Sequence, residues 1–220
     1  MLEIACFNLS SASAAARSGA DRIELCENYA AGGVTPKYES LQELRTTITK
    51  PINVMIRPRS GNFVYSMEEF EEMKSSIKIF KSLASGFVFG LLEESGCVDA
   101  TRSQELVQLA DPLPCTFHRA FDHVPDFFQA TEQIIDSGFQ SILTSGGLCD
   151  AVTGASNVME LQKRFESKIS FILGGRVRST NVRSLKSQTK LQWYHSAAIT
   201  EPGEIVDEQE VVRLQKELQE

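Results

Sequence analysis

The sequence alternates short apolar runs with longer amphipathic segments along its whole length. The apolar runs are rich in β-branched and aromatic residues and are bounded by turn-forming residues, a pattern typical of buried strands. The longer segments repeat apolar residues at helical spacing. We predict strands at residues 2–7, 22–26, 52–57, 87–92, 115–121, 141–145, 169–173 and 192–196, and helices at 11–18, 39–47, 67–82, 101–110, 126–136, 155–165, 180–187 and 207–218.

A Ser-Gly pair marks the junction between a helical segment and the next strand at three places. Gly19, Gly86 and Gly138 are each expected to adopt the left-handed conformation that ends a helix. Strands that alternate with helices over 220 residues, with short connections, predict a parallel sheet closed into a small (β/α)8 TIM barrel. We expect a single domain, residues 1–220. An open doubly wound sheet is the alternative, but the Gly-x-Gly-x-x-Gly turn expected after its first strand is missing.

Composition and charge narrow the expected partners. Hydrophobic residues make up 42% of the chain, the mean hydropathy is -0.15, and no apolar run reaches the roughly 18 residues that a membrane span needs. The first residues enter a predicted strand without a basic stretch or cleavage site, so we expect a cytoplasmic protein. A net charge of -7, with scattered basic residues, argues against nucleic acid and membrane partners. Small molecules are the expected partners.

Charged and imidazole side chains occur where predicted strands end, although a buried strand has no structural need for them. In a barrel such side chains point inward, and those near the carboxyl ends reach the active-site face. The residues expected to converge there are Glu3, Glu24, Arg57, Arg59, His118, Arg119 and His195, with Asp122 at the rim. This combination suits acid–base chemistry on an anionic substrate. The candidate catalytic residues are His118, Glu24, Asp122 and His195.

Two glycine-containing turns follow the sixth and seventh predicted strands, in Leu143-Thr-Ser-Gly-Gly147 and Leu173-Gly-Gly-Arg176. Their backbone N–H groups can approach an anion closely, and a barrel commonly holds phosphate at its last two strands. The candidate ligand-binding residues are Arg57, Arg59, Arg119, Gly146, Gly175 and Arg176. The alternative is a structural polar layer, in which Glu3 and Glu24 neutralise Arg57 and Arg119 without any chemistry.

The cysteines give a weaker signal. Their number, five, is odd and none forms a Cys-x-x-Cys motif, so we expect no disulfide framework. Cys6 and Cys26 end the first two predicted strands, which are neighbours in a parallel barrel. Two thiolates on adjacent strands suit Cu(I), whereas the alternative is that both are small hydrophobic residues of the core.

Several of these motifs together resemble the CutC family of copper homeostasis proteins. They are Ile23-Glu-Leu-Cys26, Gly32-Gly-Val-Thr-Pro36, Val54-Met-Ile-Arg-Pro-Arg59, Thr116-Phe-His-Arg-Ala-Phe-Asp122 and Ile142-Leu-Thr-Ser-Gly146. The resemblance implies a cytosolic (β/α)8 barrel that assembles as a homo-oligomer, functions in copper handling and binds Cu(I) through Cys6 and Cys26. Two positions depart from the family pattern. Asn62 replaces an acid, and Arg176 replaces a glycine, so the mouth of the barrel is more positive.

Two hypotheses about function follow from the sequence. The first is a copper homeostasis protein that binds Cu(I) through its cysteines. The second is a TIM-barrel enzyme that acts by acid–base chemistry on a small phosphorylated or carboxylated metabolite. The copper content of the protein, and whatever small molecule copurifies with it, discriminate between the two.

Overall fold

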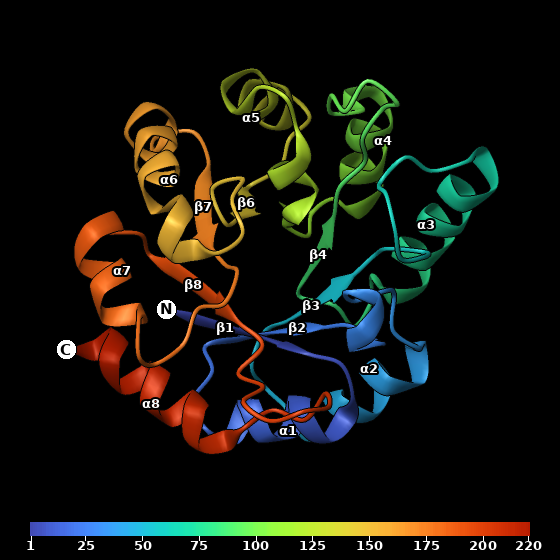
Figure 1. Ribbon diagram of the computed structural model, residues 1–220. Helices are drawn as coiled ribbons and strands as arrows, with labels where there is room; N and C mark the ends of the chain where they lie inside the picture. Colours follow the sequence, from blue (N-terminus) through green and yellow to red (C-terminus); the bar gives the residue numbers. More distant parts are fainter.

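The computed structural model describes all residues 1–220 and shows a closed barrel of parallel strands (Figure 1). Each strand pairs with its neighbours in the sequence, and the last strand pairs with the first, with Leu2 opposite Tyr194. The strands are β1 (Leu2–Cys6), β2 (Arg22–Leu25), β3 (Ile52–Met55), β4 (Gly86–Phe89), β5 (Cys115–Phe117), β6 (Ser141–Thr144), β7 (Ser170–Leu173) and β8 (Trp193–Ser196). The predicted (β/α)8 barrel is therefore confirmed.

A ring of helices surrounds the barrel (Figure 1). The helices are α1 (Leu9–Arg17), α2 (Tyr38–Arg45), α3 (Met67–Phe80), α4 (Ala100–Ala110), α5 (Phe127–Asp136), α6 (Ala151–Phe165), α7 (Val182–Thr189) and α8 (Glu208–Gln219). Most begin at a polar residue whose side chain accepts a hydrogen bond from a backbone N–H of the first turn. The clearest case is α3, where Ser66 and Glu69 form a capping box. None of the helices is long and apolar enough to cross a membrane.

Two apolar clusters hold the barrel together. The larger contains 53 buried residues and joins the outward side chains of the strands to the helices. The smaller, the inner cluster, contains Ala5, Phe7, Cys26, Met55, Val88 and Ile199. Successive strand residues face opposite sides of the wall, so β1 directs Ile4 to the larger cluster and Ala5 to the inner one. The inner cluster forms an apolar layer inside the barrel.

The structure corrects two details of the predicted elements. The strand predicted at 115–121 ends at Phe117, because the chain turns there into a short 3-10 helix, η2 (Arg119–His123). His118 caps this turn, since its Nδ1 accepts a hydrogen bond from the N–H of Ala120 over 3.2 Å. His118 and Arg119 therefore follow β5 and do not lie on it. Likewise, Arg57 and Arg59 follow β3, which ends at Met55.

The glycine predictions are confirmed at two junctions and wrong at the third. Gly19 and Gly138 adopt positive φ angles of 105° and 92°, as expected of residues that end helices. Gly86 is instead the first residue of β4. A Cβ atom at this position would lie 2.7 Å from Oδ1 of Asn53, so Gly86 permits close packing inside the barrel.

Candidate functional site

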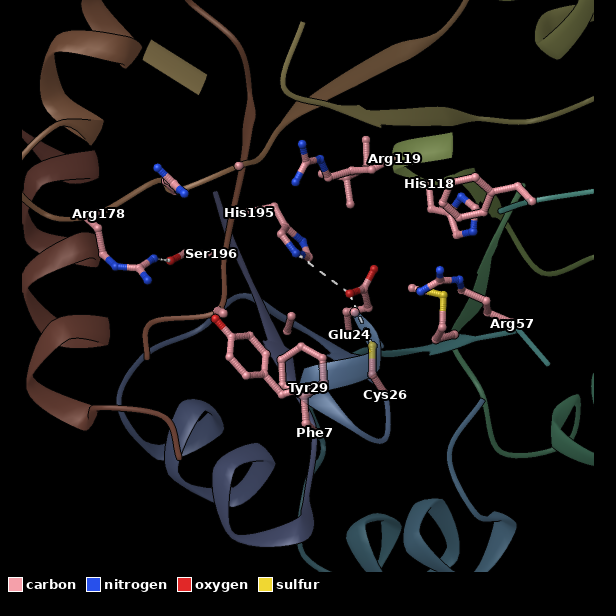
Figure 2. A pocket seen from close by; sticks show the side chains of 18 residues that line it. Phe7, Glu24, Cys26, Tyr29, Arg57, His118, Arg119, Arg178, His195 and Ser196 are labelled. Atoms are coloured by element: carbon pink, nitrogen blue, oxygen red, sulfur yellow. Dashed lines mark hydrogen bonds and ion pairs between the residues drawn. The ribbon is translucent and has the colours of Figure 1, made fainter. Parts of the chain in front are cut away.

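A cavity of about 320 Å³ opens at the carboxyl ends of the strands (Figure 2). Ala5, Phe7 and Met55 form an apolar part of its wall toward β1 and β3, and polar and apolar side chains alternate around the rest. Eight of the residues singled out in the sequence line it: Glu24, Cys26, Arg57, His118, Arg119, Gly175, Arg176 and His195. The structure therefore brings most of the predicted site together at the predicted end of the barrel.

Arg57 is a buried cation without an acidic partner. Its Nη1 donates hydrogen bonds to the carbonyl oxygens of Ala31 and Gly33 over 3.0 and 3.1 Å, and its Nη2 donates to Gly61 over 3.0 Å. No carboxylate forms an ion pair with it, and its Nε has no hydrogen-bond partner in the protein. The carbonyl dipoles orient the guanidinium but leave its positive charge uncompensated.

Two further arginines line the opposite side of the cavity. Arg178 donates hydrogen bonds to the carbonyl of Ile199 and to Oγ of Ser196, at 2.9 and 3.2 Å, and pairs with no acid. Arg176 is exposed, makes no hydrogen bond through its side chain, and adopts a positive φ of 56°. This conformation disfavours residues with a Cβ atom and is stored strain of the kind found at functional sites.

Three predicted residues have local partners. Arg59 forms an ion pair with Glu69 and does not line the cavity. Asp122 accepts hydrogen bonds from Thr144 and from the backbone N–H groups of Ser145 and Gly147, and it pairs with Arg119 over 2.7 Å. Asp122 therefore ties η2 to the β6 turn and lies outside the cavity. The predictions that Arg59 binds ligand and Asp122 is catalytic find no support in this arrangement.

The glycine turns differ in role. Gly175 lines the cavity, as expected of a residue near an anion. Gly146 does not line it, because it packs against α6: a Cβ atom on Gly146 would lie 2.2 Å from the carbonyl oxygen of Gly154. The predicted ligand contact through Gly146 is thus replaced by a contact between two backbones.

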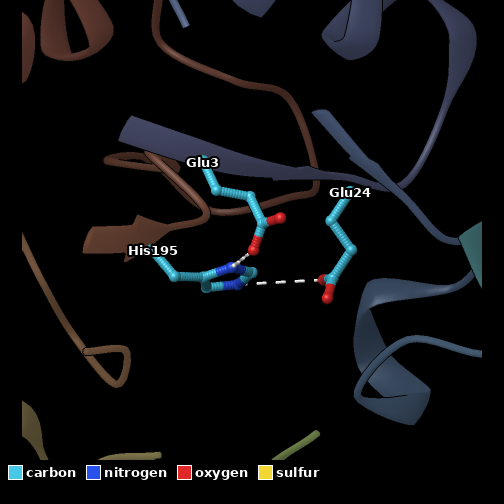
Figure 3. Close-up of side chains that lie close together, drawn as sticks. All are labelled: Glu3, Glu24 and His195. Atoms are coloured by element: carbon cyan, nitrogen blue, oxygen red, sulfur yellow. Dashed lines mark hydrogen bonds and ion pairs between the residues drawn. The ribbon is translucent and has the colours of Figure 1, made fainter. Parts of the chain in front are cut away.

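Glu3, His195 and Glu24 form a buried chain inside the barrel (Figure 3). Nδ1 of His195 lies 2.8 Å from Oε1 of Glu3, and its Nε2 lies 3.8 Å from Oε2 of Glu24. Arg22 pairs with Glu3 from the other side. The three ligand atoms lie within 4.8 Å of one another, a spacing that also suits a metal ion. Arg22 competes with a cation for Glu3, however, so proton sharing is the simpler use of this chain.

Burial and mutual charge set the protonation of this chain. Burial raises the pKa of Glu24, and His195 only partly offsets this effect. Burial opposes charge on His195, but Glu24 and Glu3 together raise the pKa of its imidazole. Burial likewise favours neutral Glu3, yet Arg22 and His195 outweigh it and lower the pKa of Glu3. Oε1 of Glu24 is buried without a hydrogen-bond partner in the protein. Glu24 and His195, whose pKa values are both raised, are therefore the pair best placed to exchange a proton in this chain.

His118 is buried on the same side of the cavity as Arg57 (Figure 2). Burial, with a smaller contribution from Arg57, lowers the pKa of His118 to about 3. The ring is consequently neutral at neutral pH and is unsuited to the acid–base role predicted for it.

The two candidate copper ligands face opposite sides of the barrel wall. Cys6 lies opposite Leu25 in the register of β1 and β2, and both belong to the larger cluster behind the wall. Cys26 is one residue further on, so its side chain faces the cavity, where Sγ lies 3.5 Å from Oε2 of Glu24. Burial and Glu24 raise the pKa of the Cys26 thiol. Of the two sulfur atoms, only that of Cys26 belongs to the cavity.

Tyr29, Phe63 and Arg178 are among the lining residues that the sequence analysis did not single out. Arg178 carried no reliable signal, because Gly175 and Arg176 adopt positive φ angles and the chain is therefore not extended between the strand end and Arg178. Tyr29 and Phe63 lie in connections after β2 and β3, where no periodic pattern indicates direction. Phe63 packs edge-on against His118 with ring centroids 4.9 Å apart.

The fold and the cavity define a class of protein: a (β/α)8 barrel with an arginine-lined cavity at the carboxyl ends of its strands. Comparison with known proteins gives the family. The CutC family profile matches residues 1–200, and the chain belongs to the CutC family. The Caenorhabditis elegans protein named copper homeostasis protein cutC homolog is 39% identical over 199 residues, which cover 90% of this chain and 80% of that protein. The human protein of the same name is 38% identical, covering 90% and 73%.

Solved structures agree with the family assignment. A CutC protein from Streptococcus agalactiae superposes with a TM-score of 0.85 at 28% identity, covering 90% of this chain and 98% of that chain. Phosphoribosylanthranilate isomerase from Thermotoga maritima gives a TM-score of 0.64 at 15% identity, covering 99% and 97%, and this likeness shows the shared fold alone.

Proposed function

We propose that this protein functions in copper homeostasis. The support is its membership of the CutC family together with the names of the relatives from Caenorhabditis elegans and human, both called copper homeostasis protein cutC homologs. A cytosolic location and assembly as a homo-oligomer, which the family resemblance implies, stay predictions.

The molecular activity that the geometry supports best is acid–base catalysis on a small phosphorylated or carboxylated metabolite. One observation carries this proposal: Arg57, Arg176 and Arg178 line one cavity, and none of them pairs with a carboxylate. A structural polar layer would neutralise the buried charge of Arg57 internally, because an unpaired charge in the core is costly. An anionic ligand neutralises the three arginines together through charge-assisted hydrogen bonds.

The remaining cavity groups supply the proton chemistry. Glu24 and His195 lie at its floor with raised pKa values, and Glu3 holds the imidazole through Nδ1. A carboxyl group whose pKa is raised is a better base when ionised, and once protonated it can return its proton to the substrate. The arginines are thus expected to position the anion while Glu24 and His195 move the proton.

Replacing Arg176 with glycine tests the anion site without disturbing the fold. We expect the affinity for phosphate or phosphoglycolate to fall roughly tenfold, the value of one charge-assisted hydrogen bond. Stability is expected to rise by up to about 1 kcal/mol, because glycine adopts a positive φ without strain. Titration calorimetry at low ionic strength measures the affinity, and thermal unfolding measures the stability.

The matched control is Lys190→Gly. Lys190 is also a basic residue with positive φ, 54°, but it ends α7 and does not line the cavity. It should gain similar stability and keep full anion affinity. Equal affinities for all three proteins, or no anion binding by the wild type, would contradict the proposed activity.

Cu(I) binding is the second candidate activity, because a cysteine lies in the cavity. Cys26 offers a soft sulfur beside Glu24, which is able to accept its proton when the metal binds. We expect Cys26→Ser to weaken Cu(I) binding by roughly tenfold or more. The control is Cys115→Ser, at a buried cysteine outside the cavity, which should leave the affinity unchanged. Competition with a Cu(I) chelator measures the affinities.

The variant Cys6→Ser tests whether both cysteines act together. Cys6 faces the opposite side of the wall, so we expect only a small effect. If Cys6→Ser weakens binding as much as Cys26→Ser, the end of β1 must rearrange to bring both sulfur atoms to the metal. If neither substitution matters, both cysteines are core residues only.

A further inference from the structure

The tautomer of His118 is set by its backbone contact. The N–H of Ala120 donates to Nδ1 of His118, so Nδ1 carries a lone pair and the ring proton lies on Nε2. Nε2 is buried and has no hydrogen-bond partner in the protein. His118 is therefore a neutral donor without an acceptor, held in the wall of the cavity.

A second unpartnered polar atom lies on the floor of the same cavity. Oε1 of Glu24 is buried and accepts no hydrogen bond, while Oε2 lies near His195 and Cys26. In Figure 2 Glu24 lies between His195 and the side of the cavity that carries His118 and Arg57. Two side chains that line the cavity, Glu24 and His118, thus each carry a buried polar atom that no group of the protein satisfies, below a rim of arginines.

We propose that the substrate is a small anionic carbonyl compound, and that His118 donates its Nε2–H to the carbonyl oxygen while Glu24 removes a proton from the adjacent carbon. This assignment rests on the proposed acid–base function and specifies its reaction class. A neutral donor suits this chemistry. The imidazole N–H stabilises the enolate oxygen through a hydrogen bond, and it does not need to transfer its proton as a cationic acid would.

The step conserves atoms and charge within the cavity. The Glu24 carboxylate takes a proton from the carbon next to the carbonyl, and the electrons of that C–H bond form a carbon–carbon double bond. The carbonyl π electrons move to oxygen, which becomes an enolate held by the Nε2–H of His118. Protonated Glu24 then returns the proton to a carbon of the enolate, which restores a carbonyl compound. No oxidant or other co-reactant is needed.

The other features of the cavity fit such a substrate. A volume of about 320 Å³ lies at the low end of ligand cavities and suits a metabolite of a few carbons. Arg178 lies on the side of the cavity opposite His118 (Figure 2), where it is able to hold a phosphate or carboxylate at the far end of the molecule, and Arg176 lines the same cavity two residues before it. The low pKa of His118 keeps its imidazole neutral over the whole physiological pH range.

Two anions that differ only in the reacting group test this assignment. Phosphoglycolohydroxamate resembles a phosphorylated enolate, whereas phosphoglycolate carries the same phosphate and a plain carboxylate. We expect the wild type to bind the hydroxamate roughly tenfold or more tightly than phosphoglycolate. His118→Leu should remove this preference, and His118→Gln, which keeps both an acceptor for Ala120 and a donor, should retain most of it. Titration calorimetry measures the affinities, with circular dichroism to confirm folding.

NMR of the wild-type protein tests the same assignment without any substitution at His118. In the ring ¹⁵N spectrum we expect His118 as the Nε2–H tautomer, with its N–H proton moving downfield when the hydroxamate binds. Equal affinities for the two anions, or an unchanged His118 signal, overturn the carbonyl assignment while the anion site stands. If neither anion binds the wild type, the assignment and the proposed acid–base function both fail.

Discussion

Replacing Gly154 with alanine is expected to lower the free energy of unfolding by about 3 kcal/mol or more. A Cβ atom at Gly154 would lie 1.7 Å from the carbonyl oxygen of Ser145 and 3.0 Å from Cα of Gly146. Both are backbone atoms, so neither can move without displacing the end of β6. The substitution should also loosen the site, because Ser145 donates its N–H to Asp122 and bonds Arg119 through Oγ.

Chemical denaturation measures this effect, and Val152→Ala on the same helix is the control. Val152 is 54% exposed, so its truncation should change stability by less than about 0.5 kcal/mol. A fully stable Gly154→Ala protein would show that α6 can move away from the β6 turn. Gly154 would then have no structural reason to lack a side chain.

Acid is expected to destabilise the protein through His118. The pKa of this imidazole is about 3 in the folded protein and near 6.5 when unfolded. Between these pH values the unfolded chain binds more protons than the folded protein. The contribution of His118 to the free energy of unfolding is therefore complete above pH 6.5 and is lost as the pH falls toward 3. From pH 7 to pH 4 this loss amounts to about 3 kcal/mol.

Comparison of wild type with His118→Gln isolates this contribution. The unfolding free energy of the wild type should fall with acid by about 3 kcal/mol more than that of the variant, measured by urea denaturation at each pH. His123→Gln, at an exposed histidine of the same 3-10 helix, should follow the wild-type profile. Parallel profiles for all three proteins would mean that His118 is accessible to water and titrates normally.

The barrel could be predicted from the sequence because each unit carries its own local signals. The apolar strand runs, the helix caps and the glycines that end helices, such as Gly19 and Gly138, act over a few residues. The ends of strands were harder to predict. The apolar run that begins at Cys115 does not show where its strand stops, and the turn after Phe117 depends on one side-chain hydrogen bond, from the N–H of Ala120 to Nδ1 of His118.

The convergence of charged residues at one end of the barrel was also predictable, since parallel strands share a direction. The choice of partner was not. Arg57 and Arg59 are two residues apart, yet Arg59 forms an ion pair with Glu69 on α3, whereas Arg57 donates hydrogen bonds to backbone carbonyl groups only. That difference depends on how the connection after β3 folds, and connections carry no periodic pattern.

Cys6 and Cys26 show that strand register limits what can be predicted from the sequence. The sequence places Cys6 and Cys26 at the ends of adjacent strands, and this is confirmed. An offset of one residue, with Cys6 opposite Leu25, sends the two side chains to opposite faces of the wall. Register depends on packing over the whole sheet, so local sequence does not specify it.

Arg176 has an evolutionary consequence. Its backbone conformation suits glycine, and arginine and glycine codons can differ by a single base, so the less strained residue is within reach of one mutation. If the side chain of Arg176 binds the ligand, selection for that contact favours arginine although glycine would be less strained. We therefore expect that, in a population grown where this protein is needed, glycine revertants at position 176 would be outcompeted, and that related chains with glycine there accept a less highly charged ligand.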